Sequence, residues 1–244
     1  MQYQLLERDA AVEREPEGGA EVRRLYDESR GCTHFSQRIL TLGAGPSGLR
    51  SATSSDEVLY VRHGSGRLSV DGTEHQLGLG SAFFIAQGTA WEVDALEGIE
   101  LLSVLVHDPA PAGATHAVLH LSAEESSGTA TAGRAFSLGA TPEVGCASVT
   151  QFVGFIPPGR APDHFHKYDE VIFVLDGEGS LFIGGEQAAL HPGACVHLPA
   201  RLVHCLENTG DSTMHVLGIF KPAGSPAEAY YPDGTQAVVP GSDD

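Results

Sequence analysis

The chain lacks any run of about 18 apolar residues, so the sequence predicts no membrane-spanning segment. Basic residues are also scarce: 14 Lys and Arg stand against 32 Asp and Glu, a formal net charge of −18. A surface this acidic repels phosphate backbones and anionic lipid headgroups, so neither nucleic acid nor membrane is expected as a partner. The first residues also lack the basic start and apolar stretch of a secretion signal, so the predicted location is cytoplasmic.

Cysteine is scarce as well. The four cysteines lie far apart and form no C-x-x-C pair, so we expect reduced, buried thiols. What the chain does contain is 30 glycines and 14 prolines, which interrupt short apolar runs. This composition is typical of an all-β chain rich in turns. With 244 residues, 41% of them hydrophobic, the chain is long enough for two domains of about 100–120 residues.

An internal repeat divides the chain into two copies. Residues 56–80 align without a gap on residues 169–193, and both segments begin with Asp-Glu-Val and share four glycine positions. Because these glycines lie between short β-type runs, they fit hairpin turns that require positive φ. The spacing predicts a β-sandwich or barrel for each copy. The expected strands are 57–62, 67–70, 81–86, 100–106 and 116–121, then 150–156, 170–175, 180–183, 194–198 and 214–220.

The second copy carries a candidate metal site. His164 and His166 are two residues apart, so on an extended strand both side chains point to the same face. Glu170 follows four residues later, and His204 lies downstream on another predicted strand. Three imidazoles and one carboxylate suit a divalent transition metal such as Fe, Mn, Ni, Cu or Zn. The sequence therefore predicts one such ion per chain.

These residues stand in two motifs that resemble those of the cupin superfamily. The first contains Gly159, the two histidines, Glu170 and Gly177, and the second contains Gly193, Pro199, His204 and Asn208. This chain has one residue fewer than usual between Gly159 and His164, and Arg201 stands where the second motif has glycine. The resemblance implies an antiparallel jelly-roll β-barrel with the ion inside. Its implied ligands are His164, His166, Glu170 and His204.

The first copy lacks this site. At the ligand positions it carries Ser51, Thr53, Glu57 and Trp91, which together suit a transition metal poorly. We therefore expect two tandem cupin barrels: residues 1–110 with a degenerate site and residues 111–244 with the metal. We expect Trp91 to fill the first cavity, with an apolar binding pocket as the alternative.

Several other residues are candidates for roles around the metal. Arg201 is one of the few cations near the predicted site, and its guanidinium suits a substrate carboxylate, with solvated rim charge as the alternative. Glu170 and Arg201 are the predicted catalytic residues. Cys205 should point away from the site if His204 points inward. Residues 122–135 are polar and predict a loop or short helix, and the tail from Pro222 is expected either to cross a barrel mouth or to be loose.

The resemblance implies a metal-dependent enzyme acting on a small organic molecule. Dioxygenase-type oxidation of an aromatic or enolisable substrate is the leading expectation. Isomerisation or epimerisation, decarboxylation and aminohydrolase activity are alternatives within the superfamily, although bicupin aminohydrolases have their metal ligands in a different order. A non-catalytic small-molecule binding protein is the alternative from another class. A homodimer is also expected as one form of assembly.

Overall fold

The computed structural model describes residues 4–6, 14–17, 19–111, 113 and 118–237. The regular structure of these residues consists of antiparallel strands and three short 3-10 turns, at Glu28–Arg30, Thr131–Gly133 and Pro142–Val144. The predicted all-β class is confirmed. No helix in the described part of the chain is both long and apolar enough to cross a membrane.

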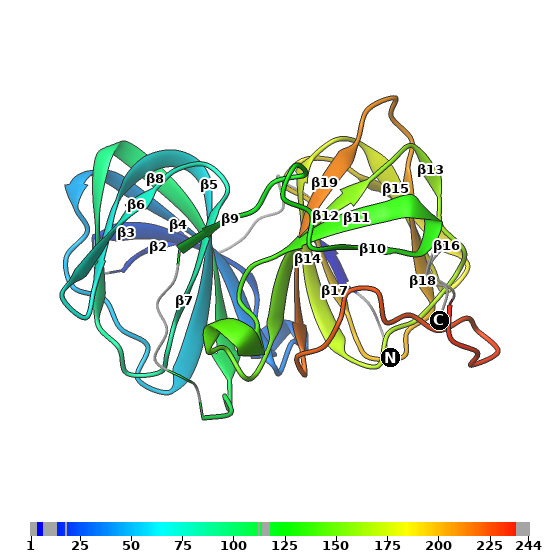
Figure 1. Cartoon of the computed structure of the whole chain (residues 1–244), viewed down its shortest axis with the longest axis horizontal. Helices are drawn as coiled ribbons and strands as arrows, with labels where there is room; N and C mark the ends of the chain where they lie inside the picture. The colour runs from blue at the N-terminus through cyan, green and yellow to red at the C-terminus, as the bar shows by residue number, and fades with distance from the viewer. Residues whose placement is uncertain (1–3, 7–13, 18, 112, 114–117, 238–244) are drawn as a thin grey trace. The chain divides into compact units, whose positions relative to one another are not determined.

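The chain forms two compact units (Figure 1). The N-terminal barrel consists of Ala11–Leu121 and Gly139–Val149, and the C-terminal barrel consists of Met1–Ala10, Ser122–Leu138 and Thr150–Asp244. The predicted division at residue 110 treated each half as continuous in sequence, whereas these units exchange short segments. Strand pairing explains the first exchange, because the strand at Gln4–Leu6 pairs with Cys195–Leu198.

One sheet with a strongly curved course builds the N-terminal barrel. Its strand order is β2-β3-β4-β8-β5-β7-β9, with β6 paired to β5. Fully buried aliphatic side chains and Trp91 fill its interior. The strands are β2 Arg14–Glu17, β3 Ala20–Tyr26, β4 Phe35–Pro46, β5 Ser55–Val70, β6 Thr73–Leu77, β7 Ser81–Ile85, β8 Trp91–His107 and β9 Val118–His120.

Two sheets build the C-terminal barrel. The larger has the order β1-β17-β14-β19-β12-β11-β10, and the smaller has the order β13-β18-β15-β16. The strands are β1 Gln4–Leu6, β10 Gly128–Ala130, β11 Arg134–Leu138, β12 Thr150–Ile156, β13 Gly159–Arg160, β14 Asp169–Asp176, β15 Gly179–Ile183, β16 Glu186–Leu190, β17 Cys195–Leu198, β18 His204–Asn208 and β19 Met214–Lys221.

Two positions show why the repeat glycines matter. Gly64 has a φ of 81°, and a Cβ there would clash with the backbone oxygen of Gly98. Gly177, its counterpart in the second copy, has a φ of 87° and lies against Met214.

Arg201 adopts a φ of 65°, the left-handed conformation that suits the glycine of the resembled motif. The turn therefore keeps its shape although the glycine is absent.

Candidate metal centre

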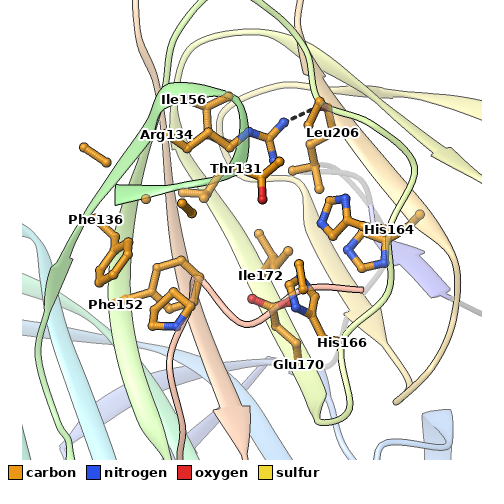
Figure 2. Close-up of a pocket in the computed structure, with 18 of the residues that line it drawn as sticks. Thr131, Arg134, Phe136, Phe152, Ile156, His164, His166, Glu170, Ile172 and Leu206 are labelled. Atoms are coloured by element: carbon orange, nitrogen blue, oxygen red, sulfur yellow. Dashed lines mark hydrogen bonds between the residues drawn. The ribbon is translucent and has the colours of Figure 1, made fainter. Parts of the chain in front are cut away.

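Backbone pairing brings the predicted histidines together in the C-terminal barrel. His164 lies before β14 and His204 begins β18, and the two residues form an antiparallel bridge. Its hydrogen bonds run from the His164 amide to the His204 carbonyl at 3.0 Å and back at 2.8 Å. With His166, their ligand atoms all lie within 4.8 Å of one another. His204, which lies 38 positions after His166, thus shares one site with the two earlier histidines (Figure 2).

Each of the three imidazoles is oriented by a backbone carbonyl. The Nδ1 atoms of His164, His166 and His204 lie 2.8 Å from the carbonyl oxygens of Pro162, Glu228 and Leu202, respectively. A carbonyl oxygen only accepts hydrogen bonds, so each Nδ1 carries the proton. Each Nε2 therefore keeps its lone pair, which is the form of imidazole that ligates a metal.

The three rings are also kept neutral. Burial, and to a smaller extent the neighbouring His164, lowers the pKa of His166 to about 3. Burial likewise lowers the pKa of His164, and it lowers that of His204 well below the ordinary histidine value. An uncharged imidazole cluster at neutral pH fits a divalent cation. The donor set and the fixed tautomers therefore fit the predicted metal.

Glu170 lies on β14 and lines the same pocket, but its carboxylate is outside the group of mutually close histidine atoms. The side chain is buried and makes no hydrogen bond or ion pair within the described part of the chain. A Cβ on Gly218 would lie 3.0 Å from its Oε1 and would clash with the ring of Phe152. In this apolar setting, burial raises the pKa of Glu170 to about 8. Its role as the fourth ligand stays a prediction.

The pocket around the histidines is mostly apolar. Phe136, Phe152, Ile172 and other apolar side chains line it, and Figure 2 shows them around His164, His166 and Glu170. Behind His166, the Tyr168 ring stacks on it with centroids 4.7 Å apart. The wall thus excludes water from much of the site and leaves few polar groups facing a ligand.

The C-terminal segment closes one side of this pocket. Phe165 and Tyr230 form a β-bridge with hydrogen bonds of 2.8 and 2.9 Å, and their rings stack with centroids 5.6 Å apart. Pro226 and Ala229 line the pocket directly. Of the two expectations for the tail, the described residues up to Ala237 support the one that places it against a barrel mouth.

Arg201 does not line the histidine pocket. Arg201 is exposed and borders a second hollow, which Arg160, Asp163 and His204 also line. The other rim cations are also engaged: Arg160 lies over the Phe182 ring and Lys167 over the Tyr230 ring, each at 3.8 Å from the centroid. The side chain of Arg201 makes no contact with the three histidines that the structure describes, so its catalytic role stays a prediction.

Sequence reasoning missed two polar residues that do line the histidine pocket, Thr131 and Arg134. Both come from the polar stretch that was expected to form only a loop or short helix; the structure shows a 3-10 turn followed by β11. The sole signal in the sequence was a single arginine in that stretch, and nothing there indicates which way it points.

The equivalent place in the N-terminal barrel holds an internal ion pair. Glu57 is buried and accepts hydrogen bonds from Arg38 at 2.9 Å and from the Ser103 hydroxyl at 2.5 Å. Trp91 is fully buried in the barrel core, in edge-to-face contact with Phe83. Among the described residues, no second cluster of candidate ligands resembles the histidine site.

The part of the chain that contains the three buried imidazoles resembles a known family. Residues 152–220 match the family described as Cupin domain. Quercetin 2,3-dioxygenase of Bacillus subtilis (strain 168) is 33% identical over 89 residues, covering 32% of this chain and 26% of that protein. An uncharacterized protein of Aquifex aeolicus (strain VF5) is 32% identical over 76 residues, covering 31% of this chain and 62% of that protein. The matches thus span less than two thirds of either relative. They support the cupin superfamily.

Solved structures extend the likeness to both barrels. A structure of Bacillus subtilis oxalate decarboxylase concerned with its Mn(II) centres gives a TM-score of 0.73 at 16% identity, covering 91% of this chain and 78% of that one. Another, at pH 4.6, gives 0.72 at 15% identity, covering 91% and 77%. Because the identity is low, this likeness concerns the fold, and it confirms the predicted jelly-roll architecture.

Proposed function

We propose that the chain is a metal-dependent cupin enzyme that oxidises a small organic molecule by dioxygenase-type chemistry. One divalent transition metal ion is held by His164, His166 and His204, with Glu170 as the fourth ligand. The observation that carries the proposal is the set of three imidazoles, each with its Nδ1 tied to a backbone carbonyl at 2.8 Å. The partial match to a quercetin dioxygenase favours oxidation over the other cupin reactions. Decarboxylation has support from fold likeness alone.

When bound, a redox-active divalent ion supplies Lewis acidity and the one-electron chemistry that oxidation by O2 requires. The residues of the chain do the rest. The carbonyl-anchored imidazoles hold fixed positions, and Tyr168 and Phe152 exclude water from two sides. Burial raises the pKa of Glu170 to about 8 in the metal-free pocket, so its carboxylate, when ionised, is a stronger base than an exposed one and suits proton transfer from a bound phenol or enol.

The N-terminal barrel has a structural role in this proposal and binds no metal. Arg38 supplies the positive charge that neutralises Glu57, so the buried carboxylate requires no external cation. The homodimer and the cytoplasmic location stay predictions.

The test begins with metal analysis of protein purified without chelators. We expect close to one equivalent per chain in the wild type and a near-complete loss in His166→Ala. His191→Ala is the matched control, because His191 is a half-buried histidine of the same barrel that does not line the pocket. Full metal content in His166→Ala would contradict the site.

Turnover is tested separately with Fe-, Mn-, Ni- and Cu-loaded protein and a panel of aromatic enols, flavonols included. O2 uptake in step with product formation is the expected result, and it should disappear in His166→Ala. Tight ligand binding without O2 uptake would favour a binding protein. Release of CO2 from a carboxylic acid without net O2 uptake would favour a decarboxylase.

A further inference from the structure

Arg134 is a half-buried cation without an acidic partner in the wall of the histidine pocket. It begins β11, and its Nη2 donates a hydrogen bond to the Leu206 carbonyl. No carboxylate lies within ion-pair distance of it among the described residues. A guanidinium has five N–H donors, so most of its donors find no acceptor in this part of the chain. Burial lowers the pKa of Arg134, and no carboxylate in the described part of the chain counters this effect.

The charge of Arg134 acts on the metal site itself. Arg134 lines the same pocket as His164, His166 and His204, so its positive charge adds to that of a bound ion. Glu170 is the one acidic residue among the residues that line the pocket. With a divalent ion bound, the pocket would hold more positive charge than Glu170 neutralises. An anionic ligand would balance this excess.

Thr131 gives a second, independent indication of a ligand. Its Oγ1 is buried and has no hydrogen-bond partner among the described residues. Figure 2 shows Thr131 beside Arg134, with its hydroxyl oxygen on the pocket side. Because buried polar atoms nearly always find a partner, an acceptor from a ligand would satisfy this hydroxyl.

We propose that the pocket binds an organic carboxylate with an apolar, ring-sized body, and that Arg134 and Thr131 recognise the carboxylate. The body of the ligand lies against Phe136 and Phe152, and the carboxylate accepts hydrogen bonds from the guanidinium and the hydroxyl. This inference rests on the proposed function, since it assigns a substrate class to the same site. It transfers carboxylate recognition from Arg201, which borders a different hollow, to Arg134.

The test compares benzoate with benzamide, which match in shape and differ in charge, by calorimetric titration of the metal-containing protein. The wild type should prefer benzoate. Arg134→Met should reduce that preference roughly tenfold or more, because it removes a charge-assisted hydrogen bond. Thr131→Val is nearly isosteric and should reduce it about threefold. Arg67→Met is the control for loss of one positive charge, because Arg67 is exposed in the other barrel.

Since Arg134 also holds the Leu206 carbonyl, Arg134→Lys is the second variant; it keeps the charge and should retain part of the preference. The proposal is overturned if wild-type protein does not prefer benzoate, or if Arg134→Met retains the full preference. It is also overturned if Arg201→Met abolishes the preference while Arg134→Met does not. Metal content, measured on the same samples, separates this failure from failure of the proposed function: absent metal in wild type contradicts the latter.

Discussion

At the scale of single residues, the two barrels treat the same buried glutamate in opposite ways. In the N-terminal barrel, Arg38 is registered opposite Ser103, and both bond to Glu57. In the C-terminal barrel, Phe152 is registered opposite Gly218, and both leave Glu170 without a donor. An arginine and a serine are thus replaced by a phenylalanine and a glycine. The first glutamate has an internal cation, whereas the second has none in the described part of the chain, which fits its predicted role as a metal ligand.

This contrast predicts how Glu170→Gln changes stability. Burial raises the pKa of Glu170 to about 8, so the folded state favours the protonated carboxyl. The stability of the folded protein is therefore highest below the unfolded-state pKa near 4.5, and it falls as the pH rises from there to about 8. Metal-free Glu170→Gln should therefore melt above metal-free wild type at pH 8, by about 2 °C or more, with little difference at pH 4.5. With metal, the order should reverse, because the amide is a poorer ligand.

Thermal melts with and without chelator at both pH values check this prediction. Glu178→Gln is the control, since Glu178 is exposed in the same barrel. Equal melting temperatures for the metal-free wild type and Glu170→Gln at pH 8 would mean that the carboxylate is not destabilised by its surroundings.

The sequence predicted the histidine cluster because the motif is short and because residues two positions apart on an extended strand face the same side. His164 and His166 are separated by one residue, and the bridge to His204 follows from the paired motifs. Arg134 could not be predicted in this way. Its side chain reaches the pocket because β11 pairs with β12, and a lone arginine in a polar stretch carries no period that indicates this pairing.

At the scale of elements, the C-terminal segment forms part of the predicted metal site. The Glu228 carbonyl orients His166, and the bridge between Tyr230 and Phe165 holds that carbonyl in place. The sequence showed two tyrosines in a segment rich in Pro, Gly and Asp, which left its position open. The position depends on a single-residue bridge, too short to give a strand pattern. A segment after the last barrel strand thereby fixes the tautomer of one predicted metal ligand, His166.

Removal of this segment should weaken metal binding without removing any ligand. A chain ending at Gly224 should lose roughly tenfold to a hundredfold in metal affinity, the usual effect of losing an orienting partner. Tyr230→Ala should give a smaller loss, and Tyr231→Ala, which leaves the stacking with Phe165 intact, should give none. Competition with a chromogenic chelator measures all three. Wild-type affinity in the truncated chain would show that the Glu228 carbonyl does not orient His166.

At the scale of the whole molecule, one repeat has produced two different barrels. The two units keep the same glycine turns and the same order of core strands, but they exchange short segments: β1 adds an edge strand to the C-terminal barrel, and Gly139–Val149 joins the N-terminal one. The repeat in the sequence predicted the shared fold. It could not predict the exchanged segments, because β1 is three residues long and pairs with a strand about 190 positions away.

The difference between the barrels predicts that metal and ion pair stabilise separate parts of the chain. Arg38→Met leaves Glu57 buried with the Ser103 hydroxyl but without its cation, so unfolding should become easier by about 3–5 kcal/mol. The double variant Arg38→Met/Glu57→Leu should recover much of this loss, because neither member of the pair then stays buried without its partner. Both proteins should still bind one metal ion per chain, and a chelator should lower their melting temperatures about as much as that of the wild type. In His166→Ala, by contrast, the chelator should have little effect. Elemental analysis and melts with and without chelator distinguish the cases. Two ions per wild-type chain would show that the guanidinium of Arg38 does not replace a cation in the N-terminal barrel, and loss of metal in Arg38→Met would show that the ion pair and the metal do not act separately.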